Sequence, residues 1–144
     1  MTGRVIVIGL VGFAAIFGVG LWYAQFHAFY EETEAEVVEI AGLIYPVSEW
    51  QGIDAASSPL KMRACFRLRD APTAPPAPEP TPLVAPPWFD CFDAGELSAA
   101  LASGDAEAYL AAREEADGVN RIVIRYPDGR AYMWRQLNER YANQ

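Results

Sequence analysis

The sequence predicts an α+β fold in which one N-terminal transmembrane helix is followed by a small domain with an antiparallel sheet and two short helices. Three observations lead to this prediction. The first is an uncharged apolar run from Val5 to Tyr23. The second is an alternation of apolar and polar residues over 61–68, and the third is a pair of strand-like runs joined by Pro127-Asp128-Gly129. Alternation and a turn of this kind are typical of antiparallel strands and hairpins.

The apolar run predicts a membrane anchor. A helix needs about 20 apolar residues to cross the hydrocarbon core of a bilayer, so we expect a transmembrane helix at about 5–24 within a signal anchor over 1–30. Because positive residues such as Arg4 favour the cytoplasmic side, we expect the N-terminus in the cytoplasm and residues 31–144 outside it. A cleaved signal peptide is the alternative, although its apolar region is normally shorter and no convincing Ala-x-Ala site follows this one.

Two sets of residues predict what this helix contacts. Small residues spaced four apart let two membrane helices approach closely, and here they are Ala14 and Gly18, then Gly20 and Ala24. They predict that an integral membrane protein packs against the helix. Amphipathic rings prefer the headgroup level, and the rings at the end of the run are Trp22, Tyr23, Phe26 and His27. We expect His27, the only histidine, to be an interfacial ring rather than a metal ligand.

The segment after the anchor is strongly acidic. It contains all nineteen carboxylates and ten of the eleven basic residues, which gives residues 31–144 a net charge of about −9. Nucleic acids and anionic lipid surfaces attract positive charge, so we expect neither as a partner of this domain. The charge suits a basic partner or simple solubility.

Residues 31–68 contain the first predicted elements of the outer domain. The acid-rich segment 31–39 could extend the anchor helix by a turn or two, whereas the β-branched segment 37–45 favours a strand. Residues 50–54 are predicted to form a structured loop. The alternating segment 61–68 predicts a half-buried strand with Cys65 on its polar face.

Two helices are predicted in the C-terminal half. Asp93 followed three residues later by Glu96 resembles a capping box, so we expect a helix that begins there and ends at Gly104. A second helix is expected over 106–116, with Gly118 as its C-cap.

Eight of the eleven prolines fall within 71–87. Proline cannot donate a ladder hydrogen bond, so we expect a proline-rich loop here. Cys65 and Cys91 flank this loop, and two thiols in one small domain outside the cytoplasm usually pair. Two reduced cysteines are the alternative if the orientation is reversed. A stretched polyproline segment of this length would span about 50 Å, whereas disulfide Cα atoms lie about 6 Å apart. We therefore expect the loop to double back and protrude.

The sequence carries no motif that predicts catalysis, a cofactor, a metal site or a small-molecule substrate. It has no glycine-rich phosphate loop, zinc-ligand spacing or nucleophile elbow. Its single histidine lies at the end of the apolar run, so a serine or cysteine triad would have no base in the outer domain. The lack of Cys-x-x-Cys argues against a thiol-redox role. We expect a protein that is not an enzyme.

Several short motifs resemble those of a known family. They are Gln51-Gly52-Ile53-Asp54, Arg63-Ala64-Cys65-Phe66, Trp88-Phe89-Asp90-Cys91-Phe92 and Tyr126-Pro127-Asp128-Gly129. With the anchor they resemble an uncharacterised family of alphaproteobacterial single-pass inner-membrane proteins with a small periplasmic domain. Members are sometimes labelled histidine kinase, which this sequence does not support because it lacks a phosphoacceptor-histidine box and ATP-binding glycines. The resemblance implies an inner-membrane and periplasmic location and supplies no catalytic residues.

Two functions fit these observations. The first is a non-catalytic, membrane-anchored accessory or assembly subunit of a larger inner-membrane complex, for example a respiratory one, held through the transmembrane helix. The alternative is a free-standing periplasmic binding or sensing domain that is tethered to the membrane and uses the proline loop or an acidic face.

Overall fold

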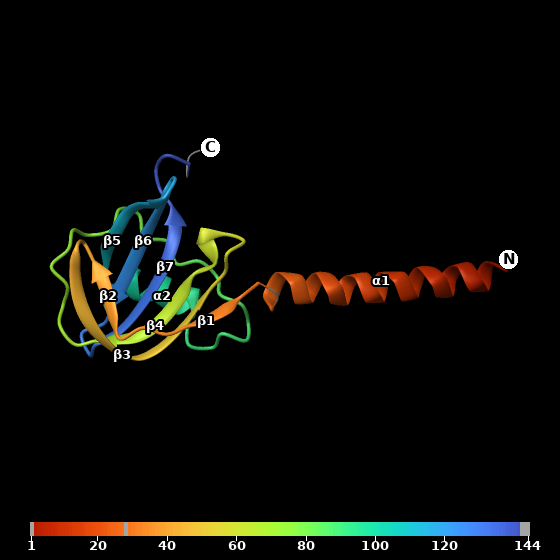
Figure 1. Ribbon diagram of the computed structural model, residues 1–144, viewed down its shortest axis with the longest axis horizontal. Coiled ribbons are helices and arrows are strands. Elements are labelled where there is room, and N and C mark those ends of the chain that lie inside the picture. Colours follow the sequence, from red (N-terminus) through yellow and green to blue (C-terminus); the bar gives the residue numbers. More distant parts are fainter. Residues whose placement is uncertain (1, 28, 142–144) are drawn as a thin grey trace.

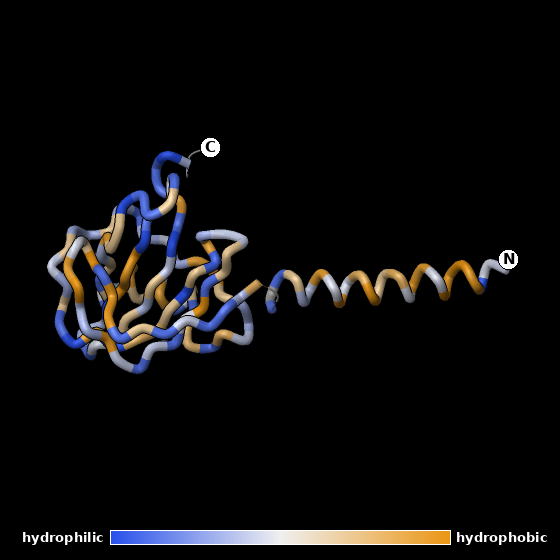
Figure 2. Tube along the Cα trace, viewed as in Figure 1, coloured by the Kyte–Doolittle hydropathy of each residue, from blue (hydrophilic) through white to orange (hydrophobic). Residues whose placement is uncertain are grey.

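The computed structural model describes residues 2–27 and 29–141. Helix α1 (Gly3–Phe26) stands apart from a domain that contains the other elements (Figure 1). Its side chains are exposed along most of its length, and hydrophobic residues predominate on it (Figure 2). The stretch Gly3–Gln25 is long and apolar enough to cross a membrane, which agrees with the anchor predicted from the sequence.

Seven antiparallel strands form the sheet of the domain. Neighbouring strands follow the order β1-β3-β4-β7-β6-β5, and β2 pairs with β3 outside this path. The bounds are β1 (Glu31–Thr33), β2 (Val37–Ile40), β3 (Leu43–Asp54), β4 (Arg63–Leu68), β5 (Glu107–Ala116), β6 (Val119–Arg125) and β7 (Arg130–Leu137), with a short 3-10 helix η1 (Pro59–Lys61) before β4. The predicted hairpin is confirmed as β6 and β7, and Gly129 supplies the positive φ, +96°, of its turn.

Strand β3 pairs with two partners along one edge. Its first residues pair with β2 across a two-residue turn at Ala41 and Gly42, and its last residues pair with β1. Between these parts the register of β3 against β4 shifts near Glu49, whose φ is +54°. An irregularity of this kind bends a strand. The bend carries β2 over one face of the sheet until it contacts β5.

Hydrophobic side chains cover both faces of the sheet. On one face, helix α2 (Ala94–Ser103) and the segment 83–92 pack over a core centred on Trp134, which is fully buried. On the other face, β2 packs over a second core that includes Phe66 and Val123. Strand β4 is consequently buried on both sides. The prediction that Cys65 lies on a polar, half-buried face was therefore wrong. Cys65 is buried in the first core, beneath α2 and the segment 83–92.

Helix α2 has the ends that the sequence predicts. The Asp93 carboxylate accepts a hydrogen bond from the Glu96 amide at 3.1 Å, and Gly104 ends the helix with a φ of +83°. A carboxylate at the N-cap satisfies an otherwise free amide, and a left-handed glycine suits the C-cap. Leu97 and Ala100 face the first core, so the amphipathic pattern positions the helix.

The second predicted helix is wrong, because residues 107–116 form strand β5. This segment is rich in alanine and glutamate, which favour helices in isolation. Pairing with β6 over most of its length outweighs that preference and buries Leu110 and Ala111. Gly118 is not a helix C-cap but part of the tight β5–β6 connection, where its φ is +70°.

Two predictions near the start of the domain were also wrong. The segment 31–39 does not extend α1, since the helix ends at Phe26 and β1 begins at Glu31. Residues 50–54 are not a loop but the end of β3, where they pair with β1 and β4. The strand predicted within 37–45 is confirmed, although a turn at Ala41 and Gly42 divides it into β2 and the start of β3. The pairing of β1 with the end of β3 joins residues about twenty positions apart, which local patterns do not reveal.

The proline-rich segment 71–87 lies against the domain instead of protruding from it. The Leu110 amide donates to the Pro75 carbonyl at 2.9 Å, and the Ala77 amide donates to the Ala108 carbonyl at 3.1 Å. These bonds seat the loop along the open edge of β5. Further on, the side chain of Gln136 accepts from the Thr81 amide at 2.7 Å, and Pro72, Pro82 and Pro86 are buried. Proline lacks an amide proton but its carbonyl still accepts, so the prolines of the loop contribute acceptors while Ala77 and Thr81 supply the donors.

Candidate functional site

The small residues predicted to contact a partner helix lie on the open surface of α1. A Cβ added at Gly18 or Gly20 would meet no other atom within 4 Å. Ala14 and Gly18 share one face of the helix, as do Gly20 and Ala24, because residues four apart are neighbours on a helix. Within the described residues no second helix covers these faces. Packing by another membrane helix remains a prediction.

The rings predicted at the membrane interface meet the domain at the end of α1. His27 lies 4.5 Å from Trp22 and 5.9 Å from Tyr23, measured between ring centroids. On its other side it stacks on Trp88 at 5.7 Å, and Trp88 meets Tyr30 edge-on at the same distance. The side chain of the fourth predicted ring, Phe26, lies outside the described part of the chain. Tyr30, three residues after His27, belongs to the aromatic cluster that the sequence places after the apolar run, whereas sequence reasoning missed Trp88, which joins it from a distant position.

The cluster holds α1 against the segment that contains the disulfide. Offset and edge-to-face ring pairs each add a modest stabilisation of about 0.5–1.5 kcal/mol. Cys91 follows Trp88 by three residues and forms the disulfide with Cys65 of β4, with the Cα atoms 6.3 Å apart. The ring contacts and the disulfide therefore hold residues 88–91, which directly follow the proline-rich segment, against both α1 and the sheet.

A buried arginine binds the proline-rich segment itself, near the disulfide. Arg63 donates from Nε to the Leu83 carbonyl at 3.1 Å and from Nη2 to the Val84 carbonyl at 3.0 Å. Its Nη1 donates to the carbonyls of Leu60 and Met62, so backbone oxygens surround the guanidinium. Burial lowers the pKa of Arg63 to about 10 and the nearby Tyr30 opposes this effect, which leaves the group protonated at neutral pH. Its role is structural.

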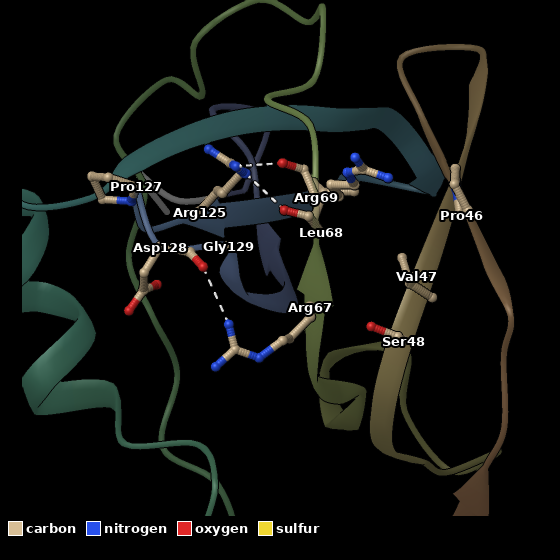
Figure 3. A pocket seen from close by; sticks show the side chains of 10 residues that line it. All are labelled: Pro46, Val47, Ser48, Arg67, Leu68, Arg69, Arg125, Pro127, Asp128 and Gly129. Carbon is tan, nitrogen blue, oxygen red and sulfur yellow. Dashed lines mark hydrogen bonds between the residues drawn. The ribbon is translucent and has the colours of Figure 1, made fainter.

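The site that the sequence does not reveal is an arginine-lined cleft of about 500 Å³ (Figure 3). It lies between the start of β3, the end of β4 and the β6–β7 turn. The β6–β7 turn is at the end of the domain far from α1 (Figure 1). Its polar groups are the guanidinium groups of Arg67, Arg69 and Arg125, the hydroxyl of Ser48 and the carboxylate of Asp128. We call it the arginine cleft.

The local fold explains why three arginines meet in the arginine cleft. Arg67 belongs to β4, and Arg69 comes directly after the last residue of that strand, so the chain brings both to the same end of the sheet. Arg125 ends β6 and donates to the carbonyls of Leu68 at 2.9 Å and Arg69 at 2.8 Å, which fixes it beside them. The Leu68 amide in turn donates to the Gly129 carbonyl at 2.8 Å and closes the floor.

Positive charge dominates the arginine cleft. Arg67 is bound to Glu49 at its rim at 2.9 Å and also donates to the Asp128 carbonyl. The Asp128 carboxylate is bound to Arg130 at 2.8 Å, and hydrogen bonds from Arg130 lower the pKa of that carboxyl. Among residues 2–27 and 29–141, the Arg69 guanidinium has no hydrogen-bond or ion-pair partner. The signal in the sequence was Arg67-Leu68-Arg69 at a strand end, which the negative charge of the whole domain obscured.

Residues 33–144 match a protein family described as "Family of unknown function (DUF6446)". The match covers the domain from the end of β1 to the last residue. The chain belongs to this family. No curated protein and no solved structure matches the chain. The arginine cleft, the disulfide and Trp88 lie within the matched residues, whereas the other junction rings, Trp22, Tyr23, His27 and Tyr30, precede them.

Proposed function

We propose that this DUF6446 protein is a non-catalytic, single-pass accessory or assembly subunit of a larger inner-membrane complex. One observation carries the proposal. Helix α1 is long and apolar enough to span a bilayer, yet the domain leaves its faces uncovered. Close approach of a second helix in lipid depends on packing and small residues rather than on hydrophobicity, and α1 offers small residues on two of its faces.

In this proposal the N-terminus is cytoplasmic and the domain is periplasmic. Arg4 lies in the first turn of α1, and positive charge favours the cytoplasmic side. The Cys65–Cys91 disulfide supports an oxidising compartment for the domain, since cytosolic thiols are kept reduced. The junction rings Trp22, Tyr23 and His27 would then lie at the periplasmic headgroup level and set the height of the domain above the bilayer.

Purification of the tagged full-length protein from native membranes in a mild neutral detergent tests the proposal. Mass spectrometry should identify membrane proteins that co-purify in a fixed ratio. The double substitution Ala14→Leu with Gly18→Leu should remove them, because two leucines would block the close approach of helices. The matched control is Gly9→Leu with Gly12→Leu, which adds comparable bulk on another side of α1. Co-purification of the Ala14/Gly18 variant at the wild-type level would contradict a partner on that face.

The arginine cleft favours a second candidate function, a free-standing periplasmic binding or sensing domain. Its guanidinium groups form a concave polar surface away from the anchor, which an accessory subunit held only through α1 would not need. Recovery of the full-length protein alone, with no membrane protein in fixed ratio, would favour this candidate over the subunit.

A further inference from the structure

We propose that the arginine cleft binds a small soluble oxyanion, namely a molecule that carries a carboxylate or phosphate group. The inference deepens the second candidate function and rests on it. It does not depend on a membrane partner of α1.

The cleft retains hydrogen-bond donors that its own contacts leave unused. Arg125 uses Nε and Nη2 on backbone carbonyls, and Arg67 uses Nε and Nη1 on Glu49 and Asp128. Within the described chain, the remaining terminal nitrogen of each has no acceptor, and Arg69 has none for any of its nitrogens. Guanidinium donors have the planar fork that matches two oxygens of a carboxylate or phosphate. The hydroxyl of Ser48 is directed toward the cleft from β3 (Figure 3).

Two of the three guanidinium groups are held in place before any ligand arrives. Arg125 is fixed by the carbonyls of Leu68 and Arg69, and Arg67 by Glu49 and the Asp128 carbonyl. Binding then immobilises mainly the Arg69 side chain. A site that is already organised loses less side-chain entropy on binding.

The charge of the surroundings restricts the ligand to a small one. Three arginines line the cleft and Arg130 lies beside it, against the carboxylates of Asp128 and, at the rim, Glu49, which leaves the cleft with a local excess of positive charge. The rest of the domain is acidic, and at physiological salt charges are screened beyond about 8 Å. A small anion inside the cleft therefore meets mainly the arginines, whereas a nucleic acid would extend over the acidic surface and be repelled. A volume of about 500 Å³ lies within the range of small-molecule sites.

The position of the cleft favours a dissolved ligand over a lipid headgroup. The β6–β7 turn that forms one wall lies at the end of the domain opposite to α1 (Figure 1). A membrane spanned by α1 is therefore on the other side of the domain. The anion has to come from solution.

The test is a titration of the full-length, ¹⁵N-labelled protein in a neutral detergent at constant ionic strength. Inorganic phosphate and succinate are added separately, with chloride balancing the salt, and the backbone amide resonances are followed. We expect saturable shifts at Ser48, Arg69 and Gly129. The substitution Arg69→Gln should weaken binding about tenfold, the effect of losing a charge-assisted hydrogen bond. Its side chain has no partner, so the fold should be unaffected.

The matched control is Arg113→Gln. Arg113 lies on β5, outside the arginine cleft, and the substitution removes the same charge from its exposed ion pair with Glu139. It should leave the affinity unchanged. Saturation by phosphate alone or by succinate alone would support the inference and identify the preferred group. Equal weakening by both substitutions, or shifts that never saturate with either anion, would overturn it. Neither overturning result would affect the co-purification test of α1.

Discussion

The amide of Ala41 donates a hydrogen bond to the carbonyl of Ala111 at 2.8 Å. The bond joins the tip of the β2–β3 hairpin, at one edge of the sheet, to β5, the strand at the other edge. It partly closes the sheet around the second core, where Ile40 and Ala111 are both buried. The position of β2, and with it the wall of the arginine cleft formed by the start of β3, therefore depends on this contact.

Substitutions at Ala41 should stabilise or destabilise the Ala41–Gly42 turn. Both residues have positive φ, +52° and +84°, which is the geometry of a type I′ turn. Because asparagine tolerates this conformation better than alanine, Ala41→Asn should raise the free energy of unfolding by about 0.5–1 kcal/mol. Ala41→Pro should lower it by about 3 kcal/mol or more, since proline cannot adopt that φ and lacks the amide proton. Urea unfolding of the full-length protein in neutral detergent measures both changes. An unchanged free energy of unfolding for Ala41→Pro would contradict a stabilising role for the Ala41–Ala111 hydrogen bond.

Arg63 should control access to the proline-rich segment. Arg63→Lys keeps the charge but cannot reach the four carbonyls that surround the guanidinium. We expect a loss of about 2–3 kcal/mol, the range for hydrogen bonds to a charged group. Limited proteolysis should show faster cleavage at Leu83 or Val84. Arg69→Lys is the control and should cleave at the wild-type rate; equal rates for the two variants would show that Arg63 does not hold the loop.

The Cys65–Cys91 disulfide should stabilise the domain by limiting the unfolded chain. With a sequence separation of 26 residues, loop-closure entropy gives about 3–4 kcal/mol. Cys65→Ala with Cys91→Ala should lower the urea midpoint by the corresponding amount, and reductant should then have no further effect. Peptide mapping of the wild type without reductant should recover one cross-linked pair. Free thiols that alkylate without reductant would contradict the pairing and the proposed compartment.

Glu115 should contribute stability that acid removes. Burial raises the pKa of Glu115, but hydrogen bonds and charge from Arg135 and Arg121 outweigh it and leave the pKa below its ordinary value of 4.5. A carboxyl with a lowered pKa stabilises the fold above that value and loses its contribution as the pH falls further. Glu115→Gln should thus cost about 1–2 kcal/mol at pH 7, allowing for partial exposure.

The difference between wild type and Glu115→Gln should shrink steadily as the pH falls below 4.5. Urea midpoints measured from neutral to acidic pH provide the test. Glu36→Gln, at an exposed position between β1 and β2, is the control and should show little difference at any pH. A constant cost of Glu115→Gln over the whole range would mean that the carboxylate does not act through its charge.

The orientation of the chain can be tested by fusion. Alkaline phosphatase folds actively only where its disulfides form, so a fusion after residue 144 should be active if the domain is periplasmic. Placing two acidic residues after Arg4 is not expected to reverse this, because acids contribute little to orientation. An intact but inactive fusion would place the domain in the cytoplasm.

Local patterns in the sequence were sufficient where the structure is stabilised locally. The Asp93 cap, the glycine at the end of α2 and the Pro127-Asp128-Gly129 turn each depend on neighbouring residues, and each was predicted. Residues 107–116 show the opposite case, because their helix-favouring composition yields to pairing with β6. Asp117-Gly118 was a turn signal that we interpreted as a helix C-cap.

The arginine cleft could not be predicted because its walls come from three separate parts of the chain. Arg67 and Arg125 are 58 positions apart and meet only through the order of strands β4, β7 and β6. The junction of His27 with Trp88 likewise depends on the path of the proline-rich segment, whose binding to β5 has no periodic signal. Net charge, an average over the domain, gave no indication of a local excess of arginine.

The proline-rich segment along β5 has a consequence for copies of the protein that share one membrane. Tethered domains are confined to a common plane, where the local concentration is high, and an open β-edge there would allow sheets of neighbouring molecules to polymerise. Pro75 and Pro76 occupy that edge and have no amide proton to offer a further strand. If α1 spans a membrane as we propose, the domains can therefore be crowded on its surface without joining one another through the β5 edge.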